Sequence, residues 1–156
     1  MTRAHAAIST VAVTFLLAVI APPWLGAHGY AVAEFGVRHF FAAVCHQRDE
    51  RSFWILGAPM AVCVRCLGVY AGAAVGSFLR LRDGVAARLL SFALALNLLD
   101  VAAESAGLHG SQPWLRLALG AALGLGAGAV LASVPSHGQA RREQWSSSAK
   151  PLSGGE

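Results

Sequence analysis

Four stretches of the chain are strongly apolar and contain few charged residues. An α-helix rises about 1.5 Å per residue, so about 20 apolar residues are needed to cross a hydrocarbon core roughly 30 Å thick. Each stretch is close to that length, and the pattern therefore predicts an all-α, polytopic membrane bundle with about four transmembrane helices. The predicted spans cover residues 4–21, 60–79, 86–103 and 114–134.

Prolines mark two of the predicted helix boundaries. Pro22 and Pro23 are expected to end the first span, and Pro59 to lie at or before the start of the second, because proline cannot donate a helical hydrogen bond. A cleaved signal peptide is the alternative for the first span, since Arg3 provides a charged start and residues 31–33 match a peptidase site. That site lies far beyond the apolar run, which favours a retained span.

Two other segments do not have the pattern of a span. Residues 34–44 mix phenylalanines with charged side chains over too short a length, which predicts an amphipathic helix lying in the membrane interface. Residues 135–156 are polar and cannot bury enough apolar area to fold, so they are expected to form a disordered tail. The membrane domain is therefore predicted to comprise residues 1–134.

The composition supports a membrane class. Hydrophobic residues make up 56% of the chain and charged residues 13%, roughly half the charge of an average soluble domain. The net charge of +4 does not indicate nucleic acid, because the basic residues flank apolar runs and form no stripe with aromatic residues. The expected partner is the lipid bilayer. No phosphate-cradling motif or nucleophile elbow occurs, which argues against an ATPase or a serine hydrolase.

Glycines recur every fourth residue in two of the predicted spans. Small residues at this spacing line one helix face and allow helix backbones to approach closely. The pattern predicts that the second and fourth spans pack against each other, or that these faces bind a second copy or another membrane protein. The six glycines are Gly68, Gly72, Gly76, Gly120, Gly124 and Gly128.

The distribution of basic residues predicts the orientation. Four spans would put both termini on one side, which then carries seven lysine and arginine residues against five on the other. Cytoplasmic segments are enriched in such residues. We therefore expect a multi-pass protein of the inner (plasma) membrane with cytoplasmic termini.

All three cysteines lie near the start of the second span. Cys45 and His46 precede it, and Cys63 and Cys66 open it at C-x-x-C spacing. Such a pair chelates a soft metal or forms a redox disulfide. Cys45 adds a third sulfur, and His46 is the preferred source of an imidazole, ahead of two other histidines, His39 and His109. Three thiolates and one imidazole are a standard zinc set, so zinc is the expected cofactor.

Three alternatives to the metal site remain open at this stage. A thiol–disulfide oxidoreductase would exchange through Cys63 and Cys66, with Cys45 as the resolving thiol. The cysteines are otherwise small apolar residues packed at a helix start. A small transporter or channel subunit would use Arg65 and Asp100 as charges within the membrane.

Charged residues in the second and third spans are expected to meet the cysteines. Arg65 lies within an apolar stretch, where it either pairs with an acidic group or extends to the membrane edge. Asn97, Asp100 and Glu104 share one face of the third helix. The second span begins where the third ends, so these side chains should converge. Arg51, in the polar segment after Cys45, completes the predicted supporting set.

The cysteine motifs carry a resemblance to a known family. The chain resembles DUF2085, a prokaryotic family of small predicted membrane proteins of unknown function. The resemblance is close over residues 44–76 and looser beyond them, and it implies the membrane architecture and the choice of residues but no reaction. The matching elements are Cys45-His46-Gln47, Val62-Cys63-Val64-Arg65-Cys66, and more loosely Asp100, Arg116, Gly120 and Gly124.

Overall fold

The computed structural model describes residues 3–148 except 80, 82, 109 and 111, and for residues 83 and 135–148 it describes the backbone alone. Helix dominates this part of the chain, which confirms the predicted all-α class. Its elements are α1 (Arg3–Ala27), α2 (Ala31–Ala42), the single-turn 3-10 helix η1 (Asp49–Arg51), β1 (Trp54–Ile55), β2 (Ala58–Pro59), α3 (Val64–Phe78), α4 (Asp83–Ser105) and α5 (Pro113–Ser148).

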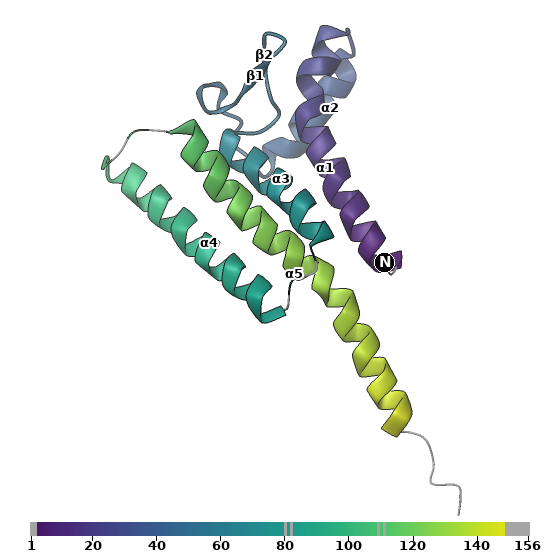
Figure 1. The fold of residues 1–156 in the computed structure, drawn as a ribbon. Coiled ribbons are helices and arrows are strands. Elements are labelled where there is room, and N and C mark those ends of the chain that lie inside the picture. Colours follow the sequence, from purple (N-terminus) through teal and green to yellow (C-terminus); the bar gives the residue numbers. More distant parts are fainter. Residues whose placement is uncertain (1–2, 80, 82, 109, 111, 149–156) are drawn as a thin grey trace, which may run out of the picture.

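The four long helices stand side by side in the order α4, α5, α3 and α1 (Figure 1). The chain runs back and forth through them, so the start of α1, the end of α3 and the start of α4 lie at one end of the bundle. The opposite end holds the end of α1, helix α2, the β1–β2 hairpin (residues 54–59), and the starts of α3 and α5. We call this the hairpin end.

Three helices are long and apolar enough to cross a membrane: Arg3–Ala27, Gly84–Ser105 and Pro113–Val134. Helix α3 is apolar but has only 15 residues, which corresponds to about 22 Å and is short of a full hydrocarbon core. The structure therefore supplies three of the four predicted spans at full length. The number of crossings stays a prediction.

Helix α3 begins later than the sequence pattern predicted. Residues 60–63 were expected to be helical, but they form a non-helical segment, bent at Ala61 and Val62, that leads from the hairpin to α3. The Met60 N–H donates to the Phe53 carbonyl at 2.9 Å, and Ala61 and Val62 are fully buried against α1 and α2. Tertiary packing therefore holds this apolar segment outside the helix, which starts at Val64.

Helix α1 also differs from its prediction, because Pro22 and Pro23 do not end it. The helix continues to Ala27, and both prolines are buried within it. A proline at position 23 cannot donate to the carbonyl of Val19, one turn earlier. The Ala61 N–H donates to that carbonyl instead, at 3.4 Å. Because of the proline pair, the Val19 carbonyl of α1 is available to accept this hydrogen bond, which anchors the segment leading to Cys63.

The glycine faces of α3 and α5 pack directly against each other, as the repeated spacing predicted. A Cβ atom added to Gly72 would lie 2.8 Å from the Leu125 backbone nitrogen, and one added to Gly124 would lie 2.8 Å from that of Ala73. Both distances are shorter than real Cβ contacts. The two glycine faces therefore contact each other within the chain.

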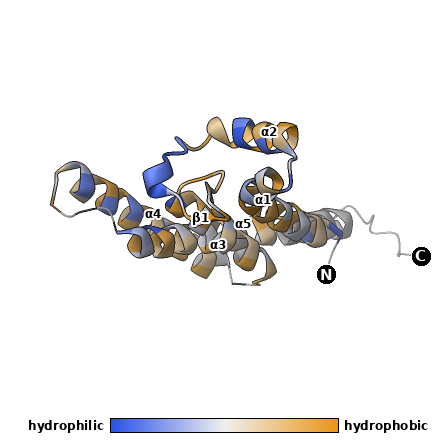
Figure 2. Ribbon diagram, turned by 90° about the horizontal axis from the view of Figure 1, so that it is seen from above, coloured by the Kyte–Doolittle hydropathy of each residue, from blue (hydrophilic) through white to orange (hydrophobic). Residues whose placement is uncertain are grey.

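Helix α2 corresponds to the helix predicted over residues 34–44 and begins three residues earlier. Seen onto the hairpin end, it lies to one side of the row of long helices, and the connection that follows it includes strongly hydrophilic residues (Figure 2). Its buried side chain is Phe41, whose ring lies 6.2 Å from that of Phe15 on α1. This contact fixes α2 against the end of α1.

The segment predicted as a disordered tail has a helical backbone as far as Ser148, because α5 continues through it (Figure 1). Helix backbone hydrogen bonds are internal, so an established helix can extend through a polar sequence. Residues 139–144 are mostly good helix formers. Residues 149–156 of the predicted tail lie outside the described residues.

Candidate functional site

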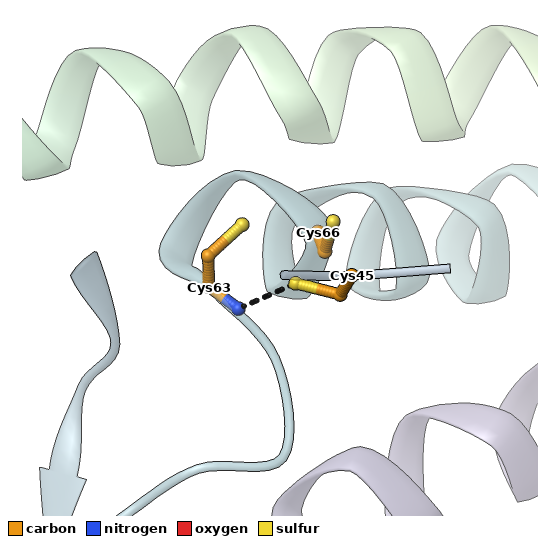
Figure 3. Close-up of side chains that lie close together, drawn as sticks. All are labelled: Cys45, Cys63 and Cys66. Carbon is orange, nitrogen blue, oxygen red and sulfur yellow. Dashed lines mark hydrogen bonds between the residues drawn. The ribbon is translucent and has the colours of Figure 1, made fainter. Parts of the chain in front are cut away.

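The three cysteines converge at the hairpin end (Figure 3). Cys45 follows α2, Cys63 is the N-cap residue of α3, and Cys66 lies in the first turn of that helix. Their sulfur atoms all lie within 4.8 Å of one another. A tetrahedral zinc ion with Zn–S bonds of about 2.3 Å would require sulfurs about 3.8 Å apart. The thiols are therefore close to the arrangement that a single metal ion needs.

Arg38 of α2 holds the two cysteine segments together. Its guanidinium donates to the Pro59 carbonyl at 2.6 Å, on the hairpin that leads to Cys63. Its own carbonyl accepts a hydrogen bond of 2.6 Å from the Gln47 side-chain amide. Gln47 has a φ of 48°, a left-handed conformation that turns the chain just after Cys45. One arginine thus links both arms of the cysteine cluster.

The surroundings of Cys45 favour the thiolate form of its side chain. Hydrogen bonds from the Cys63 and Cys66 thiols, with further ones from the backbone N–H groups of Cys63 and Gln47, lower the pKa of Cys45 well below its ordinary value. The Cys63 N–H lies 3.3 Å from the Cys45 sulfur. Burial of Cys45 acts in the opposite direction but is the smaller effect. A thiolate is the form that binds metals and attacks disulfides.

The predicted imidazole ligand does not join the sulfurs. Among the residues that the structure describes, the cluster of ligand atoms within 4.8 Å comprises the three cysteines alone. His46 is exposed and lines the cavity beside them. His39 is also exposed and stacks on Phe35 with ring centroids 5.8 Å apart. His109 lies outside the described residues.

A network of charged side chains lies beside the thiols and joins α3, α4, α5 and the loop after Cys45. Arg65 pairs with Asp100, as the sequence predicted, and lies 3.9 Å from Glu104. Glu104 also accepts from Arg116 and lies 3.4 Å from Arg51. The predicted set of Arg51, Arg65, Asp100 and Glu104 therefore does come together.

Two further polar residues link α4 with α5 near this network. The Asn97 side-chain amide donates to the Leu119 carbonyl of α5 at 2.8 Å, which fixes the predicted polar face of α4 toward α5. Arg116 is 8% exposed and was not placed in the site from the sequence. The sequence feature that could have identified Arg116 is the one that identified Arg65, a lone arginine just inside an apolar stretch.

A cavity of about 480 Å³ opens next to the thiols. This volume lies within the usual range of small-molecule sites. Its wall combines the three cysteines with four arginines from three parts of the chain. The polar lining residues are Cys45, His46, Gln47, Arg48, Arg51, Cys63, Arg65, Cys66 and Arg116. A metal ion held by the thiols would therefore have this cavity beside it.

Comparison with known proteins gives a family match and no structural match. The model of a family described as "Predicted membrane protein (DUF2085)" matches residues 45–130, from the first cysteine of the cluster into the apolar part of α5. A 36-residue stretch is 53% identical to the uncharacterized protein MJ1492 of Methanocaldococcus jannaschii, and it covers 23% of each chain. The chain thus matches less than a quarter of that relative's length. No solved structure matches the chain.

Proposed function

Because this chain belongs to the DUF2085 family of predicted membrane proteins, and its three cysteines converge, we propose that it is a membrane metalloprotein that binds one zinc ion through thiolates. Cys45, Cys63 and Cys66 are the proposed ligands. The observation that carries the proposal is the approach of all three sulfurs to within 4.8 Å of one another.

The chemistry of three close sulfurs favours a metal ion. A disulfide uses two sulfurs, whereas here a third sulfur, from a separate segment of chain, lies within 4.8 Å of both. Three thiolates so close would repel one another, and a divalent cation removes that repulsion. Zinc suits a sulfur-rich tetrahedral site and needs no redox partner. With three protein ligands, its fourth position would be open to water, His46 or a ligand from the cavity.

A thiol–disulfide exchange function is the second candidate, and one specific observation favours it. Cys63 caps α3 and Cys66 lies in its first turn. A C-x-x-C pair at a helix N-terminus is the arrangement found in thiol–disulfide oxidoreductases. In this reading Cys63 and Cys66 form a disulfide, passing two electrons and two protons to an oxidised partner, and Cys45 acts as the resolving thiol.

Exposed aromatic residues support the proposed position in the membrane. Such residues collect where a membrane protein crosses the boundary between lipid tails and water. Four of them belong to elements at the hairpin end, which would put the thiols near the lipid headgroups. With cytoplasmic termini in the inner (plasma) membrane, this boundary faces the extracytoplasmic side. The four residues are Trp24, Tyr30, Trp54 and Trp114.

Metal analysis of detergent-purified protein tests the proposal. We expect about one zinc ion per chain after purification under reducing conditions, and loss of the metal in Cys45→Ser, Cys63→Ser and Cys66→Ser. His39→Ala is the matched control, because its exposed ring lies outside the cluster. Metal retained in all three cysteine variants would refute the ligand set.

Thiol labelling separates the two candidates. A metal site should shield the cysteines from alkylation until a chelator is added. A redox pair should instead contain no metal, resist alkylation until a mild reductant is added, and yield a peptide in which Cys63 is bonded to Cys66.

A further inference from the structure

Four arginines line the cavity together with the cysteines. Arg48 and Arg51 come from the loop after Cys45, Arg65 from α3 and Arg116 from α5. An arginine side chain has a rigid fork of N–H donors that matches the oxygens of a carboxylate or phosphate. The four arginines around this cavity outnumber the carboxylates that pair with them.

The ion pairs leave an excess of positive charge. Asp100 and Glu104 are the carboxylates that pair with these arginines, so four guanidinium groups are balanced by two negative charges. Three thiolates around a divalent metal would contribute one further negative charge, and neutral thiols none. The site therefore keeps at least one positive charge in either condition. Asp49 and Glu50 are exposed and do not line the cavity.

Two of the arginines have donors to spare. Within the part of the chain that the structure describes, no acidic side chain lies within ion-pair distance of Arg48, although it lines the cavity. In the same part of the chain, the buried Arg65 Nε has no hydrogen-bond acceptor. A buried donor without an acceptor is unfavourable, because it has lost its hydrogen bonds to water. Both arginines would gain from an anion in the cavity.

We propose that this cavity is a phosphate-binding site, in which Arg48 and Arg65, the two arginines with donors to spare, contact the phosphate oxygens beside the thiols, and Arg51 and Arg116 add positive charge to the wall. The volume of about 480 Å³ is larger than a bare phosphate requires, so the ligand carries the phosphate on a larger group. That group is either a soluble phosphate ester or a lipid headgroup, because the aromatic residues place the cavity at headgroup depth. The proposal goes beyond the metal site, since it rests on the arginines.

Calorimetric titration of the detergent-purified protein tests it. The probes are inorganic phosphate, dihexanoyl phosphatidic acid, which carries a terminal phosphate, and dihexanoyl phosphatidylcholine, whose headgroup is zwitterionic. Arg48→Ala should weaken binding of the phosphate probes about tenfold, as expected for a lost hydrogen bond to a charged group. Arg51→Ala should act in the same direction. Arg88→Ala is the control, because Arg88 is an exposed arginine near the start of α4, at the opposite end of the bundle.

The pattern of binding decides both the proposal and the source of the ligand. Binding of inorganic phosphate that weakens in Arg48→Ala and not in Arg88→Ala supports a soluble phosphate ester. Binding of phosphatidic acid alone, with the same dependence on Arg48, supports a lipid headgroup. The proposal is overturned if neither phosphate probe binds, or if Arg48→Ala and Arg51→Ala bind as tightly as the unchanged protein. Metal content measured on the same samples reports separately on the thiol site.

Discussion

Replacing Arg65 and Asp100, singly and together, tests whether the charged network holds the three helices around the thiols. The Asp100 side chain is 6% exposed and that of Arg65 is 23% exposed. Removing one partner of a buried ion pair costs about 3–5 kcal/mol, because the surviving charge loses its compensation. The partial exposure of Arg65 reduces this cost, so we expect Arg65→Leu to destabilise the protein by about 2–4 kcal/mol.

The cost of replacing Asp100 depends on the other carboxylate of the network, Glu104. In Asp100→Leu, Arg65 still has Glu104, which lies 3.9 Å away in the unchanged protein. We therefore expect Asp100→Leu to cost only about 1–2 kcal/mol. The double variant removes both charges together, and its cost should fall short of the summed single costs by about 1–3 kcal/mol.

The assay is equilibrium unfolding in mixed detergent micelles, followed by tryptophan fluorescence, with Arg88→Leu as a control for loss of an exposed arginine. Alkylation of Cys66 is followed in parallel, because Cys66 adjoins Arg65 and should react faster when the pair is broken. If the single costs add to the double cost within about 0.5 kcal/mol, and Cys66 reactivity is unchanged, the two residues are independent. Arg65 would then be an arginine that only sets the membrane edge.

Three further predictions address packing, topology and ligation. Gly72→Ala should lower stability by about 1–3 kcal/mol, because the added Cβ meets the α5 backbone. Gly36→Ala has open space around it and should be neutral or stabilising in the same unfolding assay. Equal effects of the two changes would refute the close α3–α5 contact. Reporter fusions at Asp49 and after Ser148 should report opposite sides of the membrane, and the same side at both would refute the proposed topology. His46→Ala should keep its metal, since His46 lies outside the sulfur cluster. Full metal loss in that variant would instead show that His46 is the fourth ligand.

The helices, and the meeting of Arg65 with the acidic residues of α4, could be predicted because periodic, local sequence patterns indicate both. Asn97, Asp100 and Glu104 share a helix face by spacing alone, and short connections between antiparallel helices then bring that face to Arg65. The glycine repeats likewise predicted the contact of α3 with α5. These inferences needed only helix geometry and the order of the elements.

The segment before α3 could not be predicted in the same way. A short apolar run is equally compatible with a buried helix and a buried extended strand. What decides between them is the Val19 carbonyl, an acceptor that Pro23 frees some 40 residues earlier in the chain. Because that hydrogen bond depends on tertiary structure, the sequence pattern placed the helix start at Met60 rather than Val64.

The direction of individual side chains in the site could not be predicted from the sequence. His46 follows a cysteine ligand candidate, and two adjacent side chains seldom point to the same place, so it lines the cavity rather than joining the sulfurs. Arg116 was read as a flanking charge, although it lies in the first turn of α5 facing Glu104. Residue type alone could not show that His46 lies outside the sulfur cluster or that Arg116 lies inside the charged network.

X-ray absorption at the zinc edge of the purified protein tests the central claim most directly, because it reports the atoms bound to the metal. The proposed site predicts about one zinc ion per chain with three sulfur neighbours at about 2.3 Å and one lighter nitrogen or oxygen neighbour near 2.0–2.1 Å. Protein that binds no zinc when it is supplied under reducing conditions, or zinc surrounded by nitrogen and oxygen alone, would contradict the account.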